Sequence, residues 1–369
     1  MRDATVVVED GRIVEVGQRG GGEMAHGYDA TGLLVLPGFI DLHSDAIENE
    51  IQPRPGGRFP LEMALFELNK KLASCGITTM YHSLSFSMTD KNEIRQPDTA
   101  REIVRTIKDL DRHLDIRNRV HARYEMIDIG CASLLEELVE EGLVDLFSVM
   151  DHTPGQGQFV SMDAFKEYYG AVDHMNAEEL EALAERRLRA RRTLDMSHVV
   201  RLTRLCAEMG IPMASHDDDT LEKVRWVKSL GIALSEFPVT VEAASGAAEE
   251  GIHVLMGAPN ILRGRSLTKN LSGRQAVQKG WCDIMGSDYS PASMLHALFA
   301  LDRLGILPFN EIVNMVSLNP ARAVGLDLET GAIREGLKAD LVLVDTATRV
   351  PVIVGTIVEG RPVYFTGPR

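Results

Sequence analysis

Two side chains able to bind a metal ion, His43 and Asp45, stand two residues apart near the start of the chain. They follow two short apolar runs, 33–36 and 39–42, which Pro37-Gly38 separates. This pattern is typical of a buried strand. Residues two apart in an extended chain point to the same face, so an imidazole nitrogen and a carboxylate oxygen can converge on one cation. An isolated pair of this kind is more often an ordinary surface histidine and aspartate, so further ligand candidates are needed.

Apolar segments alternate with helical patterns through the middle of the chain. We predict strands near 38–43, 77–83, 119–125, 144–150, 211–216, 232–237, 252–257 and 282–287, and helices over 61–75, 99–114, 133–141, 198–209 and 221–230. Strand followed by helix, repeated eight times, predicts an α/β fold of the (β/α)₈ TIM-barrel type. The active sites of such barrels lie at the C-terminal ends of the strands.

Both ends of the chain resemble β structure. A hairpin is predicted over 4–17, and strand-like segments occupy 331–344, 350–358 and 362–365. These segments most simply pair into one small β module, 1–35 and 325–369, which brackets the barrel at 36–324.

A long connection after the fourth predicted strand, 153–197, predicts an inserted arm or lid. It contains a charged helix, 177–192, that ends in an arginine-rich run, 186–192. Such a run could bind phosphate. We interpret it as a solvated helix face, because acidic residues precede it at helical spacing.

The predicted strand ends carry mostly oxygen and imidazole ligands. They are His43 and Asp45, His82, Glu125, Asp151 and His152, His216 and Asp217, Glu236, Pro259-Asn260, and Asp288. In a barrel these side chains project into one bowl, where a cation makes so many carboxylates tolerable. The joint pattern therefore favours a metal centre.

Composition limits the class of protein. The chain has 369 residues, of which 44% are hydrophobic, 25% charged and 5% aromatic, and its net charge is -15. These values indicate a globular protein and argue against nucleic-acid or membrane partners. Four separated cysteines show neither a zinc-ribbon nor a disulfide pattern. No signal peptide or membrane-spanning stretch is evident, so we expect a cytoplasmic protein, and a homo-oligomer remains open.

These features together resemble the metal-dependent amidohydrolase superfamily over essentially the whole chain. The resemblance rests on the terminal β module, the entry 36–43, a strand-five His216, Asp288 after strand eight, and the closing segment 331–342. The chain departs from the common pattern in three ways: Asp45 replaces the usual second histidine, Glu236 replaces a histidine on strand six, and strand four ends without a lysine.

Six strings point to one branch of that superfamily. They are 43–45, 52–56, 150–156, 216–218, 256–260 and 287–289. They resemble the diphosphatase family that acts on α-D-ribose 1-methylphosphonate 5-triphosphate in the carbon–phosphorus lyase pathway of phosphonate catabolism. The resemblance implies a metal-dependent hydrolase of a phosphoric anhydride that releases diphosphate and leaves the 5-phosphate.

Such a reaction needs a metal centre and a group that handles protons. We expect two divalent ions, whose identity among zinc, manganese, iron and magnesium this mixed ligand set does not distinguish. The expected ligands are His43, Asp45, Glu125, His152, His216 and Asp288. Asp288 is also the expected catalytic residue, taking a proton from water. Glu125 is a candidate bridge between the ions, while His152 either completes the second site or contacts phosphate.

A phosphorylated substrate needs local cations, because the protein is acidic overall. The substrate-binding candidates are Arg54, Arg58, Arg263, Arg265, Lys269 and Asn260, which follow strands one and seven. Arginine's forked donors suit phosphate, although ordinary solvent-exposed arginines remain an equal alternative. We assign no role to His82 or Glu236, and we interpret the remaining histidines, His121 among them, as ordinary buried or exposed side chains.

Two other functions remain open. One is an amidase or deaminase of the same superfamily, acting on a carbonyl or amidine carbon. The other is a metal-free scaffold on the same fold, suggested by the departures at Asp45 and Glu236.

Overall fold

The computed structural model describes residues 3–18, 27–54, 56–88, 90, 92–159, 161–172, 175–267 and 270–366. Lys269, one of the expected substrate-binding residues, lies outside the described residues. The chain forms two compact units. The first comprises Met1–Met80, Leu110–Asn118 and Ile284–Arg369, and the second comprises Tyr81–Asp109 and Arg119–Asp283. Each unit is described in turn.

Eight strands form one sheet whose order is also their order along the chain. They are β4 (Phe39–Ser44), β5 (Ile77–Phe86), β6 (Arg117–Glu125), β7 (Leu146–Met150), β8 (Met213–His216), β9 (Leu234–Glu236), β10 (His253–Gly257) and β11 (Ile284–Gly286). Sequential order with helical crossovers is the (β/α)₈ arrangement, so the predicted fold class is confirmed. The predicted strands coincide with the observed ones to within a few residues.

The second unit contains the parallel ladder from β6 to β10. His121 pairs with Leu146, Ser148 with Ala214, and His216 with Glu236 in successive strand pairs. Every residue of β7 and β8 is buried, as expected for parallel strands covered on both faces. This register brings the carboxyl ends of β6 to β9 to the same edge of the ladder.

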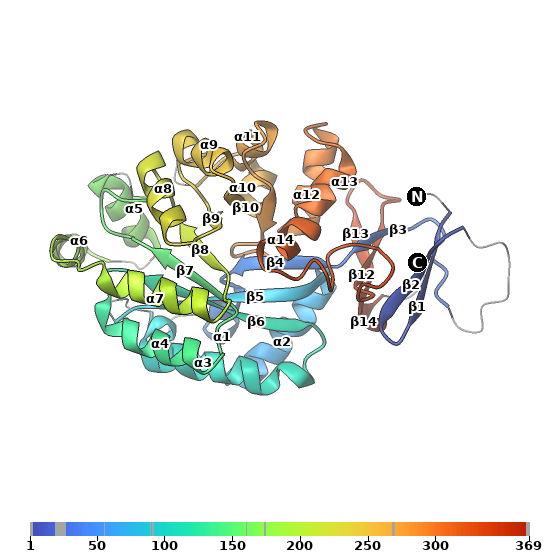
Figure 1. Ribbon diagram of the computed structural model, residues 1–369, viewed down its shortest axis with the longest axis horizontal. Coiled ribbons are helices and arrows are strands. Elements are labelled where there is room, and N and C mark those ends of the chain that lie inside the picture. The colour runs from blue at the N-terminus through green and yellow to red at the C-terminus, as the bar shows by residue number, and fades with distance from the viewer. Residues whose placement is uncertain are drawn as a thin grey trace. The chain divides into compact units, whose positions relative to one another are not determined.

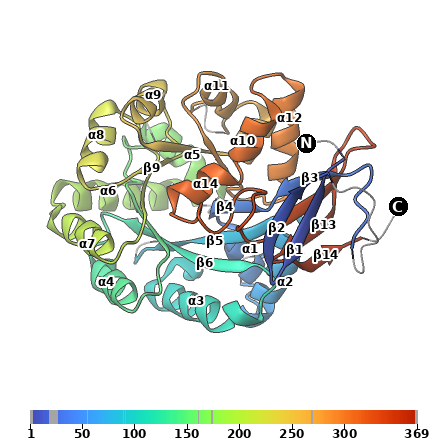
Figure 2. The same ribbon diagram turned by 45° about the vertical axis from the view of Figure 1, so that its right-hand side comes forward.

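Helices cover this ladder (Figure 2). They are α3 (Pro97–Leu110), α4 (Ala132–Glu140), α7 (Ser197–Glu208), α8 (Leu221–Ser229), α9 (Val241–Glu249), α10 (Ala258–Arg263) and α11 (Gly273–Gln278). The α4 helix packs against α7, and α8 packs against α9. Thr220 and Thr240 cap α8 and α9 by accepting backbone N–H bonds from Lys223 and Ala243. These caps fix where the short loops after β8 and β9 must end.

The long connection after β7 contains two helices, α5 (Met162–Val172) and α6 (Ala177–Arg192), which pack together (Figure 1). A capping box between Asn176 and Glu179 starts α6. The two helices share a hydrophobic cluster made of Phe159, Phe165, Tyr169, Met175, Leu180, Leu183 and Ala184. This insertion therefore has a small core of its own, and we call it the α5–α6 cap.

In the first unit, the first and last strands of the sheet meet. The N–H of Asp288 donates to the carbonyl of His43 at 2.9 Å, and the N–H of Asp45 donates to the carbonyl of Asp288 at 2.8 Å. Ser44 and Asp288 form a parallel bridge. Five helices of this unit are α1 (Ala46–Ile51), α2 (Leu61–Ser74), α12 (Ser293–Arg303), α13 (Phe309–Asn314) and α14 (Leu318–Ala323). The loops after β4 and β11 are thus joined directly.

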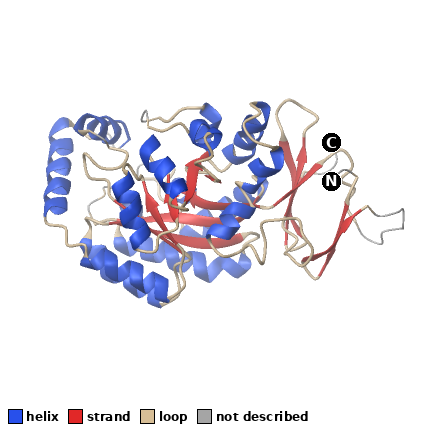
Figure 3. Cartoon of the chain, turned by 45° about the horizontal axis from the view of Figure 1, so that its top comes forward, coloured by secondary structure: helices blue, strands red, loops and turns tan. Residues whose placement is uncertain are grey.

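Both ends of the chain contribute to an antiparallel sheet in the first unit (Figure 3). Its order is β14-β13-β12-β3, formed by Arg361–Phe365, Val352–Val358, Leu341–Asp345 and Leu34–Pro37. A separate hairpin, β1 (Thr5–Glu9) and β2 (Arg12–Gly17), packs on it through a cluster of Ile13, Ala339 and Leu341. The prediction that the two ends pair is confirmed.

One predicted strand segment is wrong. Residues 331–340 are not extended, and β12 begins only at Leu341. Gly331 and Gly336 adopt positive φ angles of 92° and 87°, which interrupt an extended run. Among the described residues, no helix is long and apolar enough to cross a membrane.

Candidate metal centre

Three ligand-type side chains converge at the strand ends of the second unit. His152 follows β7, while His216 and Asp217 stand at the end of β8. The Nε2 atoms of His152 and His216 lie 3.6 and 3.7 Å from Oδ2 of Asp217. The ligand atoms of the three residues all lie within 4.8 Å of one another. The structure thus brings two of the expected ligands together and adds Asp217, which stood in the strand-end list without an assigned role.

These separations suit a metal ion. Ligand atoms about 2.1 Å from a tetrahedral cation are about 3.4 Å from one another. Within the described residues, Oδ2 of Asp217 is buried and accepts no hydrogen bond. A buried carboxylate oxygen without a donor is costly, and a cation is the group that balances it. The donor set therefore fits a divalent metal.

Asp217 is held in a strained backbone conformation. Its φ angle is +53°, a value uncommon for residues other than glycine. The ammonium of Lys223 donates to the carbonyls of His216 and Asp217 at 2.9 and 3.2 Å, which holds the turn. Phe237 and Asp288, which follow β9 and β11, also have positive φ. Such strain at three strand ends is typical of functional sites.

Glu125, at the end of β6, orients His152. Its Oε1 accepts the backbone N–H of His152 at 3.2 Å, and its Oε2 accepts Nδ1–H of the same residue at 2.7 Å. The imidazole therefore presents Nε2 toward Asp217. A carboxylate that binds one ring nitrogen while the other faces a metal is a common arrangement in metal sites.

Opposite charges dominate the electrostatics of this pair. Burial alone raises the pKa of Glu125, but the adjacent His152 ring and its hydrogen bonds outweigh burial and lower the pKa. Burial alone lowers the pKa of His152, but Glu125 and Asp217 outweigh it and raise the pKa. Metal binding at Nε2 would displace a proton, so affinity should increase with pH.

His216 has two further neighbours. Its Nδ1 lies 3.4 Å from Oε2 of Glu236, and its Nε2 lies 3.2 Å from Nη2 of Arg123. A guanidinium only donates, so Nε2 of His216 carries its lone pair in this arrangement. That is the form in which an imidazole binds a metal.

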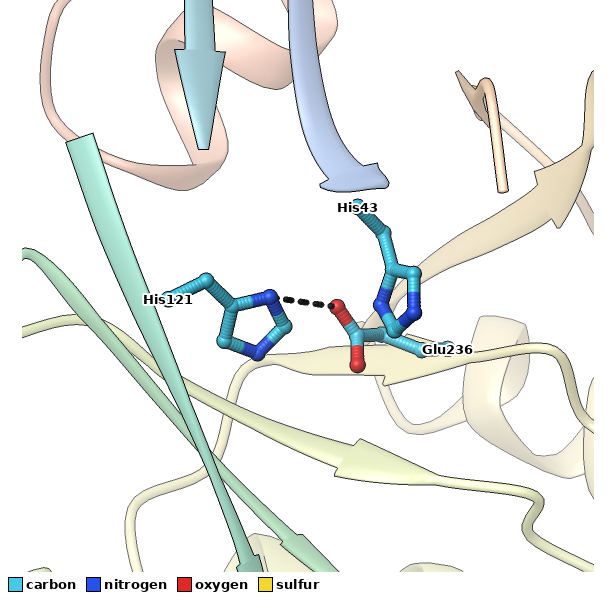
Figure 4. Close-up of side chains that lie close together, drawn as sticks. All are labelled: His43, His121 and Glu236. Atoms are coloured by element: carbon cyan, nitrogen blue, oxygen red, sulfur yellow. Dashed lines mark ion pairs between the residues drawn. The ribbon is translucent and has the colours of Figure 1, made fainter. Parts of the chain in front are cut away.

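A residue that sequence reasoning missed pairs with Glu236. His121 lies within β6, fully buried, with Nδ1 3.8 Å from Oε1 of Glu236 (Figure 4). Its ring nitrogens also lie 3.1 and 2.9 Å from the hydroxyls of Ser83 and Ser148. Our interpretation of His121 as an ordinary histidine stays a prediction, but it left strand alternation out of account. His121 and Glu125 are an even number of residues apart on β6, so their side chains share one face.

A buried carboxylate supports the ends of β8 and β9. Asp218 is fully buried, and its Oδ2 accepts the hydroxyls of Ser215 and Ser235 at 2.5 Å each. Its Oδ1 lies 3.3 Å from Nζ of Lys223. Because Lys223 also binds the carbonyls of His216 and Asp217, this network fixes both residues.

The first unit holds three more of the expected ligands, His43, Asp45 and Asp288. His43 is 1% exposed, and its Nε2 lies 3.9 Å from Oδ1 of Asp45. Backbone bonds tie both residues to Asp288. Asp41, two residues before His43, accepts the backbone N–H groups of His43 and Ser287 at 3.3 and 3.0 Å. Complete burial raises the pKa of Asp41 to about 6.

The expected substrate-binding residues differ in surroundings. Arg54, Arg58, Arg263 and Arg265 are exposed. Asn260 and Arg263 lie in α10 rather than in a loop. The amide of Asn260 donates to the carbonyl of Leu271 and accepts the N–H of Gly273, both at 3.0 Å. Asn260 therefore braces the segment after α10, and phosphate binding by the arginines stays a prediction.

Comparison with known proteins identifies the class. The Amidohydrolase family model matches residues 34–363. The chain belongs to this family. The predicted resemblance to the superfamily is thereby confirmed.

Individual relatives narrow the comparison. The chain is 34% identical over 319 residues to the α-D-ribose 1-methylphosphonate 5-triphosphate diphosphatase of Escherichia coli strain K12, covering 85% of this chain and 84% of that protein. It is 24% identical to an imidazolonepropionase of Thermoanaerobacter pseudethanolicus, covering 94% and 84% of the two chains. The structure of dihydropyrimidinase from Brevibacillus agri matches with a TM-score of 0.61 at 15% identity, covering 98% of this chain and 91% of that one.

Proposed function

We propose that the protein is a metal-dependent hydrolase that cleaves α-D-ribose 1-methylphosphonate 5-triphosphate to diphosphate and the 5-phosphate. The similarity to the Escherichia coli diphosphatase supports this substrate. The observation that carries the metal dependence is the cluster of His152, His216 and Asp217, with its buried oxygen that accepts no hydrogen bond within the described residues.

The proposed ligands are His152, His216 and Asp217, with Glu125 orienting His152. His43, Asp45 and Asp288 stay ligand candidates from the sequence. We propose two divalent ions. The oxygen and nitrogen donors suit zinc, manganese and iron, and the carboxylates also suit magnesium.

The proposed chemistry divides between the ions and the protein. A divalent cation supplies Lewis acidity, which makes water acidic enough to attack near neutral pH and offsets charge on the phosphoryl oxygens. The Asp288 carboxylate accepts the proton of the attacking water. The guanidinium groups of Arg54, Arg58, Arg263 and Arg265 bind the phosphates by forked hydrogen bonds. We also propose a cytoplasmic location, because none of the four cysteines forms a disulfide in the described part of the chain.

Phosphorus NMR tests this proposal. The metal-loaded protein is incubated with the ribosyl triphosphate in ¹⁸O-labelled water. We expect diphosphate and the 5-phosphate, with the label reporting which phosphorus is attacked. The His216→Ala variant should lose this activity, while His113→Ala, which alters an exposed imidazole, should keep it. Intact triphosphate after incubation with the metal-loaded protein would refute the assignment.

A second candidate is hydrolysis of a carbon–nitrogen bond. The match to imidazolonepropionase over 94% of this chain favours it. The substitution Arg263→Ala separates the candidates, because an uncharged amide needs no guanidinium. If the protein is a diphosphatase, Arg263→Ala should raise the KM for the triphosphate. If it is an amidase, Arg263→Ala should leave the KM for the amide unchanged.

A further inference from the structure

The arginine-rich end of α6 is not a uniform solvated face, contrary to our sequence-based interpretation. Arg187 is 4% exposed, whereas Arg186, Arg189 and Arg192 are exposed. Arg191, one helical turn after Arg187, places Nε 2.8 Å from Oδ2 of Asp151. Residues four apart share a helix face, so Arg187 and Arg191 both turn toward the end of β7.

Arg187 binds the backbone of His152 directly. Its Nη1 donates to the carbonyl of His152 at 2.9 Å and to the hydroxyl of Tyr169 at 2.8 Å. The guanidinium lies over the rings of Tyr169 and Phe165, 5.0 and 5.7 Å from their centroids. One nitrogen thus links the α5–α6 cap to a proposed metal ligand.

The surroundings of Arg187 are unusual for a buried cation. Within the described residues its Nε has no hydrogen-bond partner. Burial alone lowers the pKa of Arg187, but Tyr169, Glu125 and Asp90 outweigh burial and raise the pKa. The aromatic faces and the carbonyl of His152 therefore compensate its charge together with the nearby carboxylates of Glu125 and Asp90. If the hydrophobic cluster alone held the cap, an apolar residue at position 187 would fill the same space without a buried charge. The attraction between Arg187 and Glu125, the carboxylate that orients His152, is a second link between the cap and this proposed ligand.

A second part of the cap contacts the imidazole itself. The Phe159 ring, a member of the cap's hydrophobic cluster, lies 6.0 Å from the His152 ring. Arg187 therefore fixes the peptide of His152 while Phe159 packs against its side chain. Between them, His152 has little freedom to leave Glu125 and Asp217.

We propose that Arg187 is a positioning residue, and that through it the α5–α6 cap sets the affinity of the site for its metal ion. The guanidinium holds the His152 carbonyl, so Nδ1 stays on Glu125 and Nε2 stays directed at Asp217. This inference rests on the proposed metal dependence. It gives the cap a role in metal binding, although none of the proposed ligands lies in the cap.

Titration of the metal-free, full-length protein with Co²⁺, followed by visible absorption, tests the proposal. Arg187→Gln should weaken Co²⁺ binding by about 10- to 100-fold, the usual loss when a supporting contact of a metal ligand is removed. Arg187→Lys keeps the charge and one donor, so it should recover part of the affinity. Arg189→Gln, an exposed neighbour on the same helix, is the control and should bind Co²⁺ like the unaltered protein.

A double-mutant cycle with His152→Ala identifies the route. If Arg187 acts through His152, adding Arg187→Gln to His152→Ala should weaken Co²⁺ binding by less than about twofold more. Equal affinity of Arg187→Gln and the unaltered protein, with thermal unfolding confirming that both are folded, would overturn the positioning role alone. Absence of Co²⁺ binding by the unaltered protein would overturn the proposed metal dependence as well.

Discussion

Glu125 accepts two hydrogen bonds from His152, one from its backbone N–H at 3.2 Å and one from Nδ1 at 2.7 Å. A single carboxylate at the end of β6 thereby fixes both the peptide and the ring orientation of a residue after β7. The ring nitrogen left over, Nε2, faces Asp217.

Replacing Glu125 tests this relationship. Glu125→Gln keeps the size of the side chain but removes its charge, so the amide competes for the orientation of the His152 ring. We expect divalent metal affinity to fall by about 10- to 100-fold. Equilibrium dialysis against Zn²⁺ measures the change. Glu140→Gln, an exposed site on α4, is the matched control, and an equal loss in both variants would contradict the assigned role.

Asp217 should show opposite effects on stability and metal binding. In the metal-free protein, Asp217→Asn removes a buried charge whose Oδ2 accepts no hydrogen bond within the described part of the chain. At a pH at which His152 is neutral, we expect the free energy of unfolding to rise by about 1 kcal/mol, and metal binding to be lost. Urea unfolding and metal analysis measure the two effects. A variant that is destabilised when metal-free would show that the carboxylate is already satisfied.

Asp218 should matter for stability rather than as a ligand. Asp218→Ala leaves Lys223 without its buried partner and removes the acceptor of the Ser215 and Ser235 hydroxyls. The expected loss is about 3–5 kcal/mol, measured by urea unfolding. Adding Lys223→Met should restore part of that loss, because no buried charge is then unpaired. If the double variant loses as much free energy of unfolding as Asp218→Ala and Lys223→Met lose together, the two residues are not coupled.

Asp41 predicts how stability depends on pH. Its pKa is raised to about 6 by burial, against an ordinary value of 3.8. Between these pH values the folded state keeps a proton on Asp41 that the unfolded state has released. The free energy of unfolding therefore falls as pH rises, and this loss is complete above about pH 6. The shift corresponds to about 3 kcal/mol. The side chain of Asp41→Asn cannot ionise. As the pH rises from 3.8 to about 6, the free energy of unfolding of the metal-free variant, measured in urea, should therefore increase relative to that of the unaltered protein. A difference independent of pH would be incompatible with burial of this carboxyl in its neutral form.

The sequence predicted most of the elements and part of the candidate site. Apolar runs ending in His43, Glu125, His216 or Asp288 mark strands because parallel strands are buried on both faces. Charge pattern could not show that Arg187 turns inward while Arg189 stays exposed, since that depends on how α6 docks. Glycines at 331 and 336 broke a segment that composition alone made strand-like. Asp217 could have been predicted as a ligand, because it follows His216 directly. The sequence does not show, however, the left-handed turn after β8 that directs its carboxylate toward two imidazoles.

The central claim is that His152, His216 and Asp217 bind a divalent cation, and anomalous diffraction from crystals grown with Mn²⁺ or Zn²⁺ tests it most directly. We expect a peak about 2.0–2.3 Å from the Nε2 atoms of both histidines and from Oδ2 of Asp217. Crystals of the metal-loaded protein without anomalous density at these three atoms would contradict the account.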